Sequence, residues 1–116
     1  MSAPVRARPK VDDYMAHMVH ALKVCGEDHV GVGSDQSMTP FDDSPKAMAA
    51  FQQDVENRKK AGVSAPGEDR PPYTEGLNNP RRCEVICDSL LKRGYSGRVA
   101  EKVLGLNFTR ALTEIW

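Results

Sequence analysis

The sequence predicts an α/β chain that is mostly helical, with one principal strand at about residues 29–34. Two observations carry this prediction. Apolar residues recur every three or four positions in several segments bounded by capping residues, prolines and glycines, which is typical of amphipathic helices. Only one segment has the period of a strand: valine alternates with glycine from Val30 to Gly33. One face of that strand is β-branched, and the other leaves room for a close neighbour.

Five helices are expected, each with its own start and stop signals. Apolar residues between Val11 and Cys25 recur at helical spacing and are followed by Gly26. The other helices are delimited by the usual signals. Serine or asparagine caps and prolines mark where these helices begin, and glycines mark where they end. The helices are expected at about 11–25, 45–62, 80–94, 96–105 and 107–115, with Ser44, Ser96 and Asn107 as N-caps.

Two segments lack this periodicity. Residues 1–10 are expected to form a flexible N-terminal tail, and the proline- and glycine-rich stretch 64–80 an extended surface loop. Residues 11–116 then form one helix-strand-helix unit.

Charge and composition narrow the function. Lys and Arg number 16 and Asp and Glu number 16, so the net charge is zero and disfavours a nucleic-acid or membrane-surface role. No run of about 18 apolar residues is present, so no membrane span is expected. The three cysteines are odd in number and no secretory segment follows Met1, which predicts a reduced, cytoplasmic setting.

The run from Gly26 to Asp35, Gly-Glu-Asp-His-Val-Gly-Val-Gly-Ser-Asp, resembles the last barrel strand of the membrane (renal) dipeptidase family of zinc-dependent amidohydrolase-type enzymes. The resemblance extends to residues 17–20 before this run and to 93–96 and 105–110 after it. Roughly residues 11–116 look like the C-terminal third of such an enzyme. A complete eight-stranded barrel needs about 250 residues, so the resemblance implies an incomplete (β/α)8 barrel fragment.

The same resemblance implies one catalytic residue, Asp35. In the family, the acid after the final strand faces a two-zinc centre and transfers a proton or contacts the amino group of the substrate. A carboxylate at the carboxyl end of a barrel strand suits such general base and acid work. The alternative is that Asp35 is a turn residue, since aspartate favours the ends of strands.

The metal ligands of the family lie upstream of the segment that this chain resembles. They are a His-x-Asp pair, a bridging glutamate and two histidines, and no position here matches them. The resemblance therefore implies zinc and a small peptide substrate in the complete enzyme, with no zinc fully coordinated by this chain and no activity of the chain alone. After Asp35 the chain has Gln36-Ser37-Met38, where many members have Phe-Asp-Gly, which leaves the substrate open.

A single strand among helices leaves its backbone donors and acceptors unpaired, at about 1–3 kcal/mol for each buried group. Three explanations are open. The rest of the barrel is absent, or a complementing chain or second copy supplies the neighbouring strands, or the segment is no strand when the chain is alone.

Two other function classes are open. Residues 92–115 have the order of a helix-turn-helix DNA-binding module, although few polar residues open its second helix and the chain is neutral. The second class is a non-catalytic scaffold or split subunit that docks onto another chain through exposed helical faces. His17 and His20 lack a third metal ligand, and packing is the expected role of Cys83 and Cys87.

Overall fold

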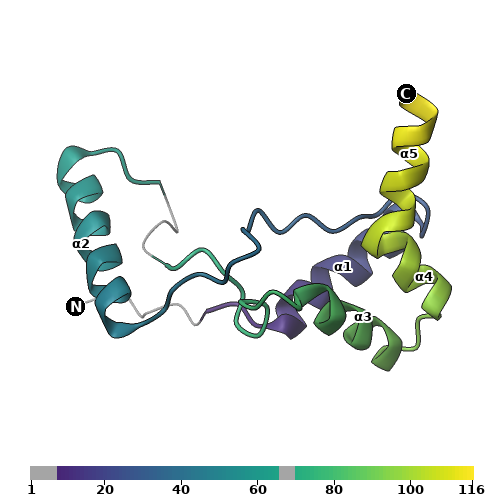
Figure 1. Cartoon of the computed structure of the whole chain (residues 1–116), viewed down its shortest axis with the longest axis horizontal. Coiled ribbons are helices and arrows are strands. Elements are labelled where there is room, and N and C mark those ends of the chain that lie inside the picture. Colours follow the sequence, from purple (N-terminus) through teal and green to yellow (C-terminus); the bar gives the residue numbers. More distant parts are fainter. Residues whose placement is uncertain (1–7, 66–69) are drawn as a thin grey trace.

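The computed structural model describes residues 8–65 and 70–116, and the regular elements within these ranges are all helical (Figure 1). One isolated parallel β-bridge, between Lys10 and Glu75, is the only β pairing among them. The elements are α1 (Val11–Cys25), α2 (Pro45–Ala61), α3 (Arg82–Lys92), α4 (Gly97–Glu101), the π-helical turn η1 (Lys102–Leu106) and α5 (Asn107–Ile115).

The first three helices begin and end within two residues of the predicted bounds. In α1 the Asp13 carboxylate accepts a hydrogen bond from the Lys10 amide at 2.8 Å, which satisfies one of the free donors of the first turn. Ser44 caps α2 by accepting from the Ala47 amide at 3.3 Å, and Gly62 ends it at φ +71°. Polar caps and glycine stops therefore act locally, as expected.

The C-terminal helices break at Gly105, as predicted: the backbone of Gly105 is non-helical (φ 179°, ψ −34°), and two helices meet there across a kink. Asn107 is not a cap, since Leu106 before it is already helical and the Asn107 side chain bonds to another segment. The reason is tertiary: the Asn107 side chain bonds to carbonyls of another segment, described below, and this outweighs its local capping preference.

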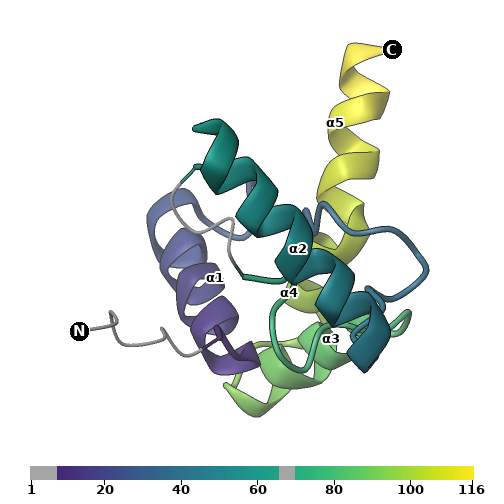
Figure 2. The ribbon, with the colours of Figure 1, turned by 90° about the vertical axis from the view of Figure 1, so that its left-hand side faces the viewer.

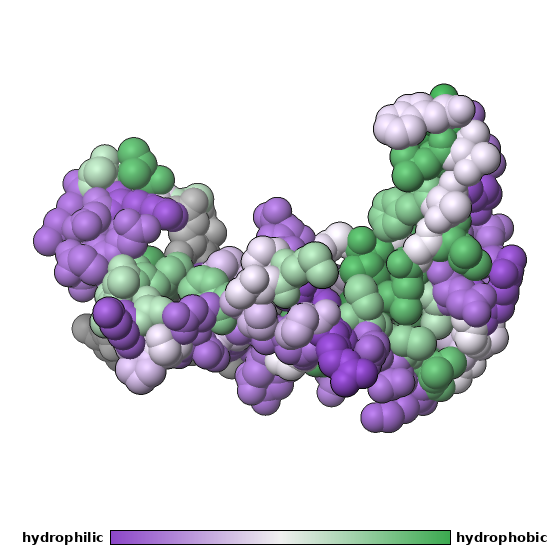
Figure 3. All heavy atoms as spheres, in the orientation of Figure 1, coloured by the Kyte–Doolittle hydropathy of each residue, from purple (hydrophilic) through white to green (hydrophobic). Residues whose placement is uncertain are grey.

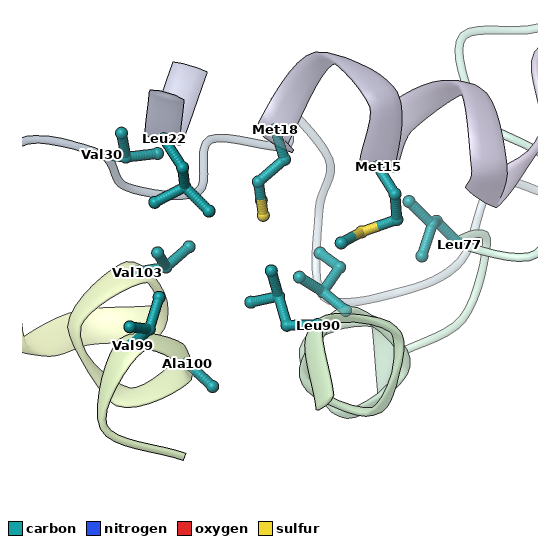
Figure 4. Packing of buried hydrophobic residues seen from close by; sticks show 10 residues of the cluster. Met15, Met18, Leu22, Val30, Leu77, Leu90, Val99, Ala100 and Val103 are labelled. Atoms are coloured by element: carbon teal, nitrogen blue, oxygen red, sulfur yellow. The ribbon is translucent and has the colours of Figure 1, made fainter. Parts of the chain in front are cut away.

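The core lies between α1, α3 and the α4–η1 region. Met15, Ile86, Leu90 and Val103 are its largest fully buried side chains. Figure 4 shows Leu22 and Val30 facing Val103, while Met15 faces Leu90 and Leu77. The expected apolar stripe of α3 is only partly correct, because Cys83 is exposed and Leu91 is 46% exposed. The remaining core residues are Met18, Val99 and Ala100.

The stretch expected to be a loop is irregular over residues 70–80, and 66–69 lie outside the described residues. It is tied to other segments: the Asn78 side chain exchanges two hydrogen bonds with the backbone of Phe41, at 2.7 and 2.9 Å, and the Tyr73 ring lies 5.5 Å from the Phe41 ring. Of the expected flexible tail 1–10, residues 1–7 lie outside the described range. Pro9 accepts a hydrogen bond from the Glu75 amide at 2.8 Å.

The prediction of a principal strand at 29–34 is wrong for the chain alone. Residues 30–34 follow an extended course in Figure 1 but belong to no β-ladder. The physical reason is the one that the sequence raises: a strand needs neighbours to pair with its backbone, and the described residues supply none. The fold is therefore all-helical instead of α/β.

The chain is spread out for its size. Its radius of gyration is 17.3 Å, whereas a compact domain of this length has about 13 Å. Figure 1 shows α2 and α5 at opposite ends of the molecule, and the side view in Figure 2 shows α5 projecting away from the packed helices α1, α3 and α4. The core therefore occupies only part of the molecule.

Candidate functional site

Asp35, the one predicted catalytic residue, lies directly after the extended segment 30–34. Its backbone is left-handed, at φ +52°, and no other described residue except glycine has a positive φ. Aspartate tolerates this conformation better than most residues. The side chain is exposed, so its carboxylate is accessible to a ligand or a partner.

The segment before Asp35 is held by Asn107. The Asn107 Nδ2 group donates to the carbonyls of Glu27 at 2.8 Å and Val30 at 2.9 Å. Asn107 is 7% exposed, and Val30 is buried beside it. Asn107 therefore fixes the segment onto the helical core, a role that the sequence did not reveal because an asparagine near a helix start is typical of a cap.

The next residue of α5 covers one face of the segment. The Phe108 ring lies so close to Gly31 that a Cβ atom built on this glycine would be 2.4 Å from the ring. Gly33 has no such neighbour among the described residues. The expectation that glycine leaves room for a close neighbour is therefore confirmed at Gly31.

The chain after Asp35 is also anchored. The Gln36 side chain donates to the carbonyl of Pro72, and Arg82 Nη1 donates to the carbonyl of Ser37 at 3.1 Å. Asp35 thus sits between two fixed points, which limits the positions that its carboxylate reaches.

A charged cluster marks the opposite, amino end of the segment. Lys102 Nζ lies 2.7 Å from Glu27 and 2.9 Å from Asp28, and Arg110 contacts the Asp28 carboxylate at 4.0 Å. The hydrogen bond and charge of Lys102 lower the pKa of Asp28, and the bonds to Glu27 and Asp28 raise the pKa of Lys102. This cluster fixes the turn between α1 and the segment and is distinct from the Asp35 end.

The backbone of residues 31–34 makes no hydrogen bond to other backbone groups within the described part of the chain. Beside this segment, α5 exposes an apolar stripe at helical spacing, of which Phe108 and Leu112 are each 50% exposed and Ile115 is 72% exposed. Figure 3 shows hydrophobic surface along the side of α5 that is turned toward the middle of the molecule. Open backbone edges and an uncovered apolar helix face therefore adjoin each other.

The described residues do not form a zinc site. No group of three or more His, Cys, Asp or Glu side chains in ranges 8–65 and 70–116 is arranged to hold a metal ion. His17, His20 and His29 are all exposed. A zinc centre of the kind implied by the resemblance therefore does not fit this chain's own side chains, and Asp35 stands without metal ligands around it.

Four basic residues of the helix-turn-helix alternative lie close to acidic ones. Arg93 pairs with Asp12 at 2.8 Å, Arg98 lies 3.7 Å from Glu101, and Lys102 and Arg110 belong to the Asp28 cluster. A break at Gly105 separates the two helices of this alternative, and DNA binding stays an untested alternative.

None of the helices in the described part is long and apolar enough to cross a membrane. No protein-family model matches this chain, and no solved structure matches it either.

Proposed function

We propose that this chain supplies the proton-transferring carboxylate of a dipeptidase-type metallopeptidase, and that it works only after docking onto neighbouring strands that carry the metal ligands. The observation that carries the proposal is the extended segment 30–34, which Asn107 holds against the helices at Val30 and whose residues 31–34 make no hydrogen bond to other described backbone groups. The segment is followed by the exposed Asp35, whose backbone is left-handed. In the docked state the segment is the last strand of an incomplete (β/α)8 barrel. The resemblance of residues 26–35 to the dipeptidase family supports this assignment.

The role of Asp35 is proton transfer. Its carboxylate accepts a proton from the attacking water and returns it to the leaving amine of a small peptide, which is general base and then general acid catalysis. The zinc implied by the resemblance activates water in enzymes of this type, and its ligands belong to the docked partner because the described residues lack them. The isolated chain is expected to hydrolyse no peptide.

The test is a complementation assay. The chain is mixed with a dipeptidase of this family that is truncated just before its own last barrel strand, with zinc and a dipeptide substrate. We expect hydrolysis only in the mixture, and its loss when the mixture contains Asp35→Asn. Asp43→Asn is the matched control, because Asp43 is an exposed aspartate in the loop that precedes α2, and it is expected to keep the activity.

A non-catalytic docking subunit is the second candidate, and the exposed apolar stripe of α5 favours it. The same assay separates the two. Stable complex formation without any turnover, or with turnover that Asp35→Asn leaves intact, would favour the docking subunit and contradict a catalytic role for Asp35.

A further inference from the structure

The extended segment 30–34 turns its two faces toward different parts of the chain. Val30 is buried opposite Val103 of η1 (Figure 4), and Val32 packs against the same core cluster. Gly31 lies between the two valines, and a Cβ atom built on it would meet the Phe108 ring of α5. Because successive residues of an extended chain point to opposite faces, Phe108 covers the face that is turned away from the core.

This cover is partial and easy to displace. The Phe108 ring is 50% exposed, so it buries only part of the apolar surface that a core phenylalanine buries. Gly33, the next residue on the same face, has open space at its Cβ position within the described part of the chain. A single half-exposed ring therefore closes one end of the face and leaves the other end open.

The start of α5 stays in place when the ring moves. The Asn107 side chain donates to the Val30 carbonyl at 2.9 Å, and Arg110 Nη2 donates to the Asp28 carbonyl at 2.5 Å. These bonds hold the backbone on both sides of Phe108, so its side chain can swing toward solvent while the helix remains attached.

The covered face is the one that docking requires. In a (β/α)8 barrel the helices lie outside the strands, and side chains fill the interior in layers. Since Val30 and Val32 face the helices, the face with Gly31 and Gly33 points to the interior of the barrel. A ring of α5 over Gly31 then occupies space that side chains of the partner strands need.

We propose that Phe108 is an autoinhibitory cover. In the isolated chain its ring takes the place over Gly31 that a side chain of the docked partner fills, and it swings away as the partner docks. The inference rests on the proposed function, because it concerns the same docking surface, and it adds a step that limits the rate of docking.

The test measures association of the immobilised chain with the truncated dipeptidase by biolayer interferometry. We expect Phe108→Ala to associate about threefold to tenfold faster than the unaltered chain, since the cover is worth about half of the burial of a phenylalanine side chain. Trp116→Ala is the matched control: Trp116 is an aromatic residue at the end of the same helix, is 92% exposed, and is expected to leave the rate unchanged. By NMR, nuclear Overhauser effects between the Phe108 ring and Gly31 are expected in the free chain and lost in the complex.

The outcomes separate this inference from the proposed function. Equal association rates of Phe108→Ala and the unaltered chain, or ring contacts that persist in the complex, would overturn the cover and leave the proposed docking intact. A rate gain that Trp116→Ala shares would reflect loosening of α5 and would also overturn the cover. Failure of both the unaltered chain and Phe108→Ala to associate would contradict the proposed function, and the inference with it.

Discussion

Asn107 shows how a single side chain positions the candidate site. It is the only polar residue that is buried in the described chain, and its amide bridges the carbonyls of Glu27 and Val30 at the start of the extended segment. A hydrophobic residue at this helix position would leave both carbonyls without this donor. Specific placement of the segment, rather than burial alone, is the function of this asparagine.

Asn107→Ala is therefore expected to destabilise the chain by about 1–3 kcal/mol, because it leaves the Val30 carbonyl buried and unpaired. Urea unfolding followed by circular dichroism measures the change. Asn57→Ala is the control: Asn57 is exposed on α2 and is expected to change stability by less than about 0.5 kcal/mol. Equal effects of the two substitutions would contradict the role assigned to Asn107.

The charged cluster gives a second prediction for single residues. Lys102 lowers the pKa of Asp28, so the contribution of this pair is fully present above the ordinary value of 3.8 and is lost as the pH falls through the lowered pKa. The raised pKa of Lys102 has the opposite sign: its contribution is present below 10.5 and is lost as the pH rises through the raised value.

Carboxyl carbon NMR titration of Asp28 measures this effect. In Lys102→Gln the midpoint of Asp28 is expected to rise toward 3.8, whereas Arg98→Gln, which removes a pair with Glu101 instead, leaves it unchanged. An Asp28 midpoint that does not respond to Lys102→Gln would show that the cluster does not form in solution.

Among the elements, α5 has little packing to support it. The residue at its start, Asn107, is its one buried member, while the apolar stripe that continues from Phe108 faces solvent. Short helices are marginal in water without tertiary packing. The last two turns of α5 therefore depend on a covering surface that the chain alone does not supply.

Amide hydrogen exchange tests this difference between elements. Residues 110–115 of α5 are expected to exchange at rates close to those of an unfolded chain, and the buried turn of α1 from Met15 to Leu22 much more slowly. Comparable protection of the two helices would mean that α5 is stable by itself.

The contact between α5 and the extended segment has its own test. In Gly31→Ala the new methyl group meets the Phe108 ring, which must swing toward solvent because it is half-exposed. We expect nuclear Overhauser effects between the ring and residue 31 to disappear, with little loss of stability. Gly33→Ala has open space around it and is expected to keep them; their loss in both variants would contradict the contact.

Features that depend on neighbouring residues in the sequence were predicted well, whereas features that depend on contacts between distant segments were not. Helices α1 to α3 were predicted because caps, prolines and glycines act within one turn. The helix break at Gly105 was predicted as well, whereas the N-cap at Asn107 was wrong because two long-range hydrogen bonds of Asn107 outweigh its capping preference. The strand at 29–34 did not form because the described residues offer it no neighbour to pair with, and the catalytic role of Asp35 stays a prediction.

At the scale of the whole molecule, the solvent-accessible surface area is larger than that of a compact domain of the same mass. The chain exposes 8477 Å², and a compact monomer of its mass exposes about 6,300 Å². The excess is comparable to the area that stable protein interfaces bury. This excess surface, the unpaired backbone of residues 31–34 and the uncovered apolar stripe of α5 support the proposal that the chain completes its fold on a partner.

The most direct measurement of that claim is amide exchange at residues 31–34, alone and with the truncated dipeptidase. The account predicts rates near those of an unfolded chain for the isolated protein, and protection of about a hundredfold or more once neighbouring strands pair with the segment. Strong protection in the isolated chain, or none in the mixture, would contradict it.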